Sequence, residues 1–289
     1  MRTPKVLLLG LALSVLAGCG AAGAGENDPS RAGAAPATSA ASATASAAPA
    51  PSHAAKSPAA TPPATAPTKT KPATKAKPVR KKRARTIAGG PAGSLTRTGR
   101  AGVALTFDDG PDPVQTPRLL DLLKREHVKA TFCVVGRNVA AYPGLVRRIA
   151  AEGHTLCNHT WNHSLTLGKK KRSVIRADLR RTNNAIRRAV PKARIAYMRA
   201  PGGNFTPAFV AVARTMGMKS IYWQVDPRDW EHKRGESSAA HKKKVVRTVQ
   251  KHVGRGAIVL SHDYRQPDTI AAYRKLIPWL RARYRLIAL

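Results

Sequence analysis

From residue 101 to the C-terminus, short apolar runs alternate with longer stretches in which apolar residues recur every three to four positions. The short runs are rich in Val, Ile, Leu and Phe and predict strands, whereas the longer amphipathic stretches predict helices. The predicted strands are residues 102–107, 130–135, 154–157, 195–198, 220–225, 257–260 and 285–288. The predicted helices are residues 117–126, 143–152, 174–190, 207–216, 241–253 and 269–283. This alternation indicates an α/β domain of about seven parallel strands with outer helices, arranged as a closed or nearly closed barrel or as a doubly wound sheet.

The first hundred residues lack this alternation. Two basic residues in the first five precede an apolar run over residues 6–16, followed by small residues. This order is typical of a secretory signal and is too short for a mature membrane-spanning helix. The ending Leu-Ala-Gly before Cys19 resembles the bacterial lipobox, which implies a lipoprotein signal peptide over residues 1–19 and lipidation of Cys19. The alternative is an ordinary signal that is cleaved at a nearby small residue.

Residues 20–100 are a low-complexity stretch of Ala, Pro, Ser, Thr, Gly and, later, Lys. Such a segment buries too little apolar surface to offset its chain entropy, so we expect a disordered, extended linker before a folded domain over residues 101–289. The leader and the linker together place the domain outside the cell, anchored to the outer face of the membrane and reaching into the wall.

Both halves of the chain are basic. Residues 1–100 carry fifteen Lys and Arg against two acids, residues 101–289 carry thirty-six against thirteen, and the net charge is +36. Because export removes nucleic acid from reach, we expect contacts with an anionic membrane surface or anionic wall polymers instead. A solvated linker with a compositional bias explains part of the charge. No nucleic acid partner is expected, and the protein is expected to be a monomer.

Two cysteines remain in the predicted domain, Cys133 and Cys157, both at or near predicted strands. The sequence leaves open whether they are bridged or are two buried thiols. The oxidising environment of an exported protein favours the bridge.

Polar side chains follow the ends of successive predicted strands. Asp108 and Asp109 follow the first, His159 the third, Arg199 the fourth, and Ser261 and His262 the sixth. In a parallel sheet covered by helices these ends meet at one edge, where functional sites are built.

Asp108 and Asp109 are adjacent carboxylates, and their mutual repulsion is relieved most simply by a divalent cation. His159 and His163 are four residues apart, which allows both rings to reach one ion. Two imidazoles and one carboxylate bind such a metal and leave positions open for water and substrate. Taken singly, each motif also has a purely structural interpretation, such as a solvated turn or a hydrogen-bonded histidine at a strand end.

Three further motifs carry candidate chemistry. Arg199 precedes a Pro-Gly-Gly turn whose backbone N–H groups can approach an oxyanion. Asp226, Asp229 and Trp230 lie together in a stretch with two carboxylates and a bulky apolar ring. His262 offers an imidazole that can donate a proton.

The ordered set TFDDG, HTxxH, RxPxG, DxxDW and LSH resembles the five motifs of the polysaccharide deacetylase family, the NodB homology domain of carbohydrate esterase family 4. The resemblance covers residues 101–289 and implies a distorted (β/α) barrel. It also implies metal ligands at Asp109, His159 and His163, with zinc as the expected ion and cobalt or nickel as alternatives. One departure stands out, because members often carry an aromatic residue where this chain has Gly202.

The resemblance further implies roles for the remaining motif residues. Asp108 corresponds to a general base and Arg199 to the residue that holds it. His262 corresponds to a general acid, paired with Asp226 or, alternatively, Asp229. The substrate-contacting positions are the backbone N–H of Gly202 and the apolar walls Trp230 and Leu260.

From these observations we predict a metal-dependent hydrolase that removes N-acetyl groups from a cell-envelope polysaccharide, with peptidoglycan favoured over chitin-type oligomers. One alternative is an O-acetyl esterase on a xylan-like glycan. Another is a non-catalytic surface lipoprotein that binds polyanions.

Overall fold

The structure, a computed structural model, describes residues 89–289. The predicted signal peptide, Cys19 and the predicted linker as far as residue 88 lie outside the described residues. The strands are β1 (Val103–Asp108), β2 (Thr131–Val134), β3 (Thr155–Asn158), β4 (Tyr197–Met198), β5 (Lys219–Ser220), β6 (Ile258–His262) and β7 (Leu286–Ile287). The α-helices are α1 (Gln115–Arg125), α2 (Gly136–Ala141), α3 (Pro143–Ala151), α4 (Arg172–Ala189), α5 (Pro207–Thr215), α6 (Ser238–His252) and α7 (Pro267–Arg281). Three short 3-10 turns complete the fold, at Pro91–Gly93, Leu167–Lys169 and Pro201–Gly203.

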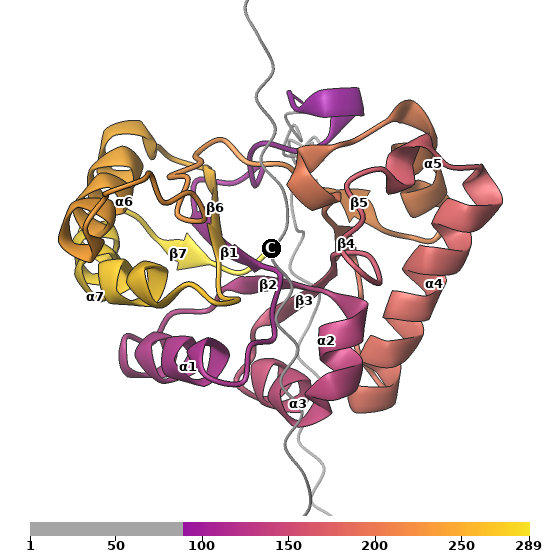
Figure 1. The fold of residues 1–289 in the computed structure, drawn as a ribbon, viewed down its shortest axis with the longest axis horizontal. Coiled ribbons are helices and arrows are strands. Elements are labelled where there is room, and N and C mark those ends of the chain that lie inside the picture. The colour runs from indigo at the N-terminus through magenta and orange to yellow at the C-terminus, as the bar shows by residue number, and fades with distance from the viewer. Residues whose placement is uncertain (1–88) are drawn as a thin grey trace, which may run out of the picture. The chain divides into compact units, whose positions relative to one another are not determined.

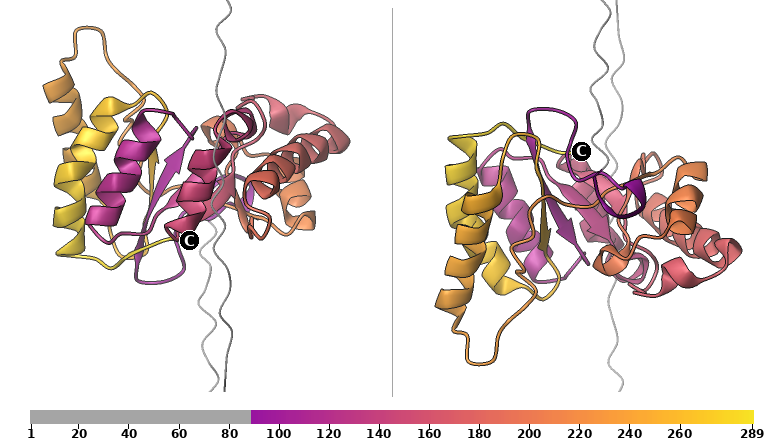
Figure 2. Two further views of the ribbon diagram at one scale, coloured as in Figure 1. Left: turned by 90° about the horizontal axis from the view of Figure 1, so that it is seen from below. Right: turned by 90° about the horizontal axis from the view of Figure 1, so that it is seen from above.

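The strands form a curved parallel sheet in the order β5-β4-β3-β2-β1-β6, and β7 also pairs with β1. The helices lie outside this sheet, with α6 and α7 on one side and α4 and α5 on the opposite side (Figure 1). The two turned views show the same arrangement of helices around the sheet (Figure 2). All six residues of β1 are buried, as expected for a central strand covered on both faces.

The barrel is closed between β5 and β6 by single bridges instead of a continuous ladder. Leu95 bridges Ile221 just after β5, and Val225 bridges Val259 in β6. The backbone N–H of Leu95 donates to Ser220 at 2.9 Å. This nearly closed arrangement agrees with the distorted (β/α) barrel that the sequence resemblance implied.

The structure corrects the sequence-based elements at three places. Residues 89–100 were expected to belong to the disordered linker, but Leu95 and its neighbours pair with the sheet and Ser94 is fully buried. The strand predicted over 220–225 is a ladder only over Lys219–Ser220, because the following residues cross to β6. Helix α2 was not predicted, since its six residues are too few to show a helical period.

Side-chain caps explain why two helices begin where they do. Thr206 accepts the backbone N–H of Phe209 at the start of α5, and Ser237 accepts that of Ala240 at the start of α6. Helix α6 therefore starts three residues before the predicted His241.

Cys133 and Cys157 lie directly opposite each other in the β2–β3 register and form a disulfide. They pack with Ile221 in a small apolar cluster, separate from the main core between sheet and helices. The question that the sequence left open is thus decided by strand register. Within residues 89–289 we find no helix with the length and apolarity needed to cross a membrane.

Candidate active site

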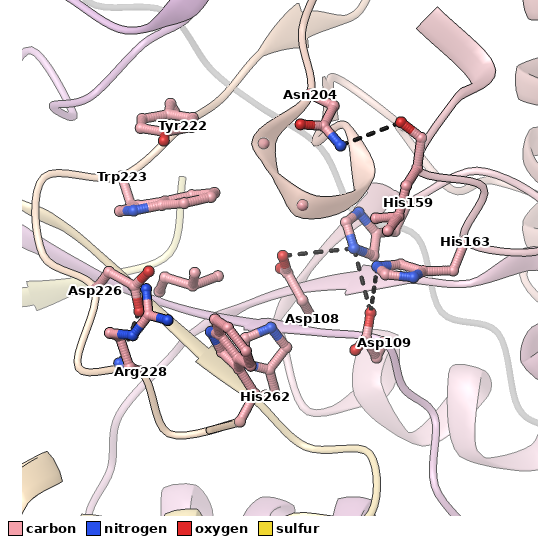
Figure 3. Close-up of a pocket in the computed structure, with 15 residues that line it drawn as sticks. Asp108, Asp109, His159, His163, Asn204, Tyr222, Trp223, Asp226, Arg228 and His262 are labelled. Carbon is pink, nitrogen blue, oxygen red and sulfur yellow. Dashed lines mark hydrogen bonds and ion pairs between the residues drawn. The ribbon is translucent and has the colours of Figure 1, made fainter. Parts of the chain in front are cut away.

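The carboxyl ends of the strands surround a pocket of about 640 Å³. Figure 3 shows its lining side chains converging from β1, the loop after β3 and the end of β6. The lining residues are Asp108, Asp109, His159, His163, Leu165, Gly202, Gly203, Asn204, Tyr222, Trp223, Asp226, Arg228, Trp230, Leu260 and His262. The parallel sheet therefore brings the motif residues together at one edge, although they lie up to about 150 positions apart in the chain.

Asp109, His159 and His163 form a compact cluster at the base of this pocket (Figure 3). Oδ1 of Asp109 lies 3.3 Å from Nε2 of His159 and 3.3 Å from Nε2 of His163. The Nδ1–H of His159 donates to the backbone carbonyl of Arg199 at 2.8 Å, because a carbonyl only accepts. In the neutral ring this leaves the Nε2 lone pair facing the carboxylate.

The loop that carries the two histidines is held by α2 and α4. The backbone N–H groups of Gly136 and Arg137, at the start of α2, donate to the carbonyls of Thr160 and Trp161 at 2.9 Å. A Cβ on Gly136 would lie 2.6 Å from the Trp161 ring, so only glycine permits this approach. The unpredicted helix α2 thus positions the histidine loop.

The backbone conformation around the cluster is unusual for side chains of this size. Asp109 (φ 75°), Thr160 (φ 66°) and His163 (φ 58°) all lie in the left-handed region. Such conformations persist where the surroundings enforce them and concentrate at functional sites. Asn138 of α2 contributes here, since its side-chain amide donates to the Asp109 carbonyl at 2.7 Å.

The cluster fits a divalent metal ion. Within residues 89–289, Oδ1 of Asp109 is buried without a hydrogen-bond partner, although it faces two imidazole nitrogens. The three potential ligand atoms lie within 4.8 Å of one another. Burial raises the pKa of Asp109, but the close contact and charge of His159, together with the charges of His262 and His163, outweigh it and hold this pKa well below its usual range. An ionised carboxylate and two imidazoles are a ligand set for zinc and similar ions.

Arg199 holds Asp108 beside this cluster. The guanidinium is completely buried, and Nη1 donates to Oδ1 of Asp108 at 2.6 Å and to Oγ1 of Thr106 at 2.9 Å. Its Nη2 donates to the carbonyl of Tyr222 at 3.0 Å. The second carboxylate oxygen of Asp108 lies 3.6 Å from Nε2 of His159. Arg199 therefore fixes one oxygen of Asp108 and leaves the other directed at the cluster of Asp109, His159 and His163.

His262 is paired with Asp229, which corrects the preferred assignment of Asp226. Oδ1 of Asp229 lies 2.9 Å from Nδ1 of His262, and Oδ2 accepts the backbone N–H of His262 at 2.8 Å. Asp229 is fully buried and also accepts the Thr269 hydroxyl at 2.7 Å. Asp226 instead accepts the backbone N–H of Arg228 at 2.8 Å, and burial raises its pKa. The tight turn at Arg228 (φ 51°) directs Asp226 into the pocket and Asp229 beneath His262.

His262 is held in its protonated form. Burial lowers the pKa of its imidazole, but the charge and hydrogen bond of Asp229, with the nearby carboxylates of Asp109 and Asp108, raise it to about 9. Because Nδ1 faces Asp229, the proton available to a ligand in the pocket is on Nε2.

The apolar wall of the pocket includes residues that the sequence did not single out. Gly202, Trp230 and Leu260 line the pocket, so their predicted contact with substrate stays consistent with their positions. Tyr222 and Trp223 are stacked with ring centroids 3.8 Å apart and lie close against Gly203, where an added Cβ would come within 2.5 Å of the Tyr222 ring and 2.7 Å of the Trp223 ring. Leu165, Asn204 and Arg228 also line the pocket. Two adjacent aromatic residues shortly after β5 are the sequence signal by which Tyr222 and Trp223 could have been found.

Comparison with known proteins places this arrangement in a family. The profile of the family described as polysaccharide deacetylase matches residues 96–221. A chitooligosaccharide deacetylase of Sinorhizobium fredii is 38% identical over 198 residues, covering 64% of this chain and 88% of the relative. The chain belongs to the polysaccharide deacetylase family. A peptidoglycan-N-acetylglucosamine deacetylase of Bacillus cereus is 35% identical over 190 residues, covering 64% of this chain and 84% of that protein.

A solved structure also resembles this deacetylase domain. It is a mutant, with restored enzymatic activity, of a family 4 pseudoenzyme from Bacillus anthracis. The mutant is 28% identical, has a TM-score of 0.60 and covers 67% of this chain and 68% of its own. Because the family includes a pseudoenzyme, the side chains of each member decide its activity. In this chain the motif residues Asp108, Asp109, His159, His163 and His262 all line one pocket.

Proposed function

We propose that this chain is a metal-dependent hydrolase that removes N-acetyl groups from a cell-envelope polysaccharide, with peptidoglycan as the favoured substrate. The observation that carries the proposal is the placement of two opposed groups in one pocket. Asp108 is held by Arg199 beside the ligand cluster, and His262 is held protonated by Asp229. Amide hydrolysis needs one group to take a proton from water and another to give one to the departing nitrogen.

The residues Asp109, His159 and His163 would hold the metal, and zinc is the ion that suits two imidazoles and a carboxylate, with cobalt or nickel as alternatives. When bound there, such an ion supplies Lewis-acid polarisation of the carbonyl and of the attacking water. The protein groups then divide the proton transfers between them.

Asp108 accepts the proton of the attacking water at the oxygen that Arg199 does not hold. Burial of Arg199 and its three hydrogen bonds fix the direction of the Asp108 carboxylate. The turn at Gly202 lines the pocket with a backbone N–H that we assign to the developing oxyanion. The C–N bond then breaks, acetate keeps the oxygen of the water, and the amine takes its proton from Nε2 of His262.

The names of the relatives support an N-acetylated glycan as substrate, since they include chitooligosaccharide and peptidoglycan deacetylases. The exposed Trp230 and the Tyr222–Trp223 stack provide flat apolar faces suited to sugar rings. An O-acetyl esterase would use the same groups, because the attack of water on the carbonyl carbon is common to ester and amide hydrolysis. The two reactions differ only in the leaving atom, which is oxygen in the ester and nitrogen in the amide.

The deciding experiment measures acetate release by the full chain from peptidoglycan, chitooligosaccharides and acetylxylan, with and without a chelator. We expect release from peptidoglycan that is abolished by chelation and restored by zinc. Faster release from acetylxylan would instead establish the esterase, and no release from any of the three with any divalent metal would overturn catalysis.

We further propose that the protein is exported and held at the outer face of the membrane through a lipid on Cys19. The support is the basic start, apolar run and Leu-Ala-Gly-Cys ending of residues 1–19. Fractionation of cells that express the full chain tests this directly. The wild-type chain is expected in the membrane fraction, and Cys19→Ala in the soluble exported or unprocessed fraction. If Cys19→Ala stayed in the membrane fraction to the same extent as the wild-type chain, the proposed lipid anchor would be contradicted.

Polyanion binding is a second candidate function, because a groove of about 470 Å³ between α6 and α7 is lined by four cations, Lys242, Lys243, Arg247 and Lys275. A cluster of cations in one groove favours an anionic polymer such as a phosphodiester wall polymer. Binding of the full chain to such a polymer should weaken with salt and should weaken further in Lys243→Glu/Arg247→Glu. The matched control is Arg187→Glu/Arg188→Glu on α4, and equal loss in both pairs would assign the binding to overall charge.

A further inference from the structure

A second group of metal-ligating side chains lies outside the pocket, in the loop after Trp230 and the first turns of α6. It consists of His232, Glu236 and His241, each of which offers one ligand atom within 4.8 Å of the other two. None of these residues belongs to the five motifs or lines the catalytic pocket. His232 is exposed, Glu236 is partly buried and His241 is completely buried.

The hydrogen bonds of His241 leave one ring nitrogen in an unusual contact. Its Nε2 lies 2.9 Å from the backbone carbonyl of Asp229, so Nε2 carries the proton and donates it. Its Nδ1 lies 3.0 Å from Oε2 of Glu236. In a neutral imidazole Nδ1 is then a lone pair, and a lone pair facing a carboxylate is repulsive. A cation between them, either a proton or a metal ion, is required.

The third ligand stands next to this pair. The His232 ring stacks on the His241 ring with centroids 3.7 Å apart and planes 16° apart. Parallel rings direct their lone pairs side by side, so joint binding of an ion requires the His232 ring to rotate. Because His232 is exposed, rotation is not opposed by packing. Lys244, whose Nζ lies 3.6 Å from Oε2 of Glu236, competes for the same carboxylate.

The surroundings of His241 are those of a metal ligand. Ligating imidazoles usually donate their second N–H to a carbonyl or carboxylate, which fixes the tautomer and the direction of the ring. The carbonyl of Asp229 does this for His241. Two imidazoles and one carboxylate again form the set that suits zinc, nickel or cobalt.

We propose that His232, Glu236 and His241 form a second binding site for a divalent transition-metal ion, distinct from the cluster at Asp109. An ion there joins the loop after Trp230 to α6. Asp229, the residue before Trp230, holds His262 through its carboxylate and His241 through its backbone carbonyl. The site therefore stiffens the segment that positions the proposed proton donor.

The test is metal stoichiometry of the full chain, measured by equilibrium dialysis against zinc and by the visible absorption of cobalt. The wild-type chain is expected to bind two ions, and His159→Ala/His163→Ala is expected to keep one. Adding His232→Ala or Glu236→Gln to that double variant should remove the remaining ion or weaken its binding by roughly tenfold or more. Because His232 is exposed, its replacement does not disturb the core.

Matched controls are His127→Ala and His252→Ala, which remove histidines remote from the group and should leave the stoichiometry unchanged. If the double variant binds no metal, or if His232→Ala and Glu236→Gln titrate like their parent, His241 and Glu236 are a simple ion pair and the site does not exist. Acetate release is not part of this measurement, so its outcome is independent of the proposed deacetylation.

Discussion

Asp229 holds His262 at two points, since one carboxylate oxygen lies 2.9 Å from the ring Nδ1 and the other accepts the backbone N–H of the same residue at 2.8 Å. This double contact fixes both the position of the strand end and the rotation of the ring. It also leaves Nε2 as the ring nitrogen that faces the pocket.

Asp229→Asn is expected to lower kcat by roughly 10² to 10⁴-fold, the range typical of losing a positioned acid or base. The amide keeps the shape of the carboxylate but removes the charge that favours imidazolium, so the alkaline limb of the pH–rate profile should move to lower pH. Asp226→Asn, which removes a pocket carboxylate that does not contact His262, should cause a smaller loss and leave that limb in place. The reverse order of effects would restore Asp226 as the partner. Steady-state acetate release over a pH series is the measurement.

The pH dependence of the wild-type enzyme follows from the raised pKa of His262, about 9. A proton donor is competent below its pKa, so the rate should be steady near neutrality and fall tenfold per pH unit above the limb. A metal ion at Asp109 cancels part of that residue's attraction for the imidazolium, so the limb of the loaded enzyme should lie at or below pH 9. A rate that continues to rise above pH 9.5 would contradict His262 as the donor.

Asp108→Asn should abolish most acetate release, by roughly 10² to 10⁴-fold, while leaving metal binding intact. Asp108 is held by Arg199 and stands beside the ligand cluster, 3.6 Å from His159, without being one of the three grouped ligands. Turnover and bound metal are measured on the same preparation. Turnover close to wild type would remove Asp108 as the base, and loss of metal would instead make it a ligand.

His159→Ala should lower the affinity of the catalytic cluster for its metal by at least tenfold and lower turnover in parallel, as chelation does to the wild type. Its Nε2 faces Asp109, and its Nδ1 is held by the Arg199 carbonyl. Alanine removes the ring and with it the nitrogen that would bind the metal. His127→Ala, which removes an exposed histidine outside the cluster, is the control and should leave metal affinity and turnover unchanged. If His159→Ala bound as much metal as the wild type when metal is limiting, His159 would not be a ligand.

Acid stability should depend on His154, which is buried behind β2 and β3. Its Nδ1 accepts the backbone N–H of Ala130 at 3.1 Å, and burial, with the charge of Lys129, lowers the pKa of the ring to about 4. The unfolded chain takes up this proton near pH 6.5, so the stabilisation is complete above pH 6.5 and is lost as the pH falls through 4. The loss amounts to roughly 3 kcal/mol.

Asn at position 154 keeps an acceptor near the Nδ1 position and cannot be protonated. His154→Asn should therefore show a shallower fall in the free energy of unfolding between pH 6.5 and 4, measured by urea denaturation. An identical pH dependence in both proteins would assign the acid sensitivity to other groups.

The sequence predicted the element order well where apolar runs are long and their periods clear. β1 and α7 appear within two residues of their predicted starts, because a buried strand and a long amphipathic helix each show several repeats of their pattern. Helix α2 has too few residues for a period to show, and the residues after Ser220 leave the ladder to close the barrel. The pairing of Leu95 with Ile221 is equally invisible in the sequence, because low apolar content marked the preceding hundred residues as linker.

By itself, the sequence determined which candidate groups this chain carries, because adjacent carboxylates, histidines four residues apart and an arginine before a Pro-Gly-Gly turn are local features of the chain. Only the tertiary structure decided which partners meet. The turn at Arg228 points Asp229, and not Asp226, at His262, and the Asp229 carbonyl holds His241. Both contacts depend on the backbone angles of the loop around Arg228. Packing between strands that are far apart in the chain sets these angles, so no local pattern of residues predicts them.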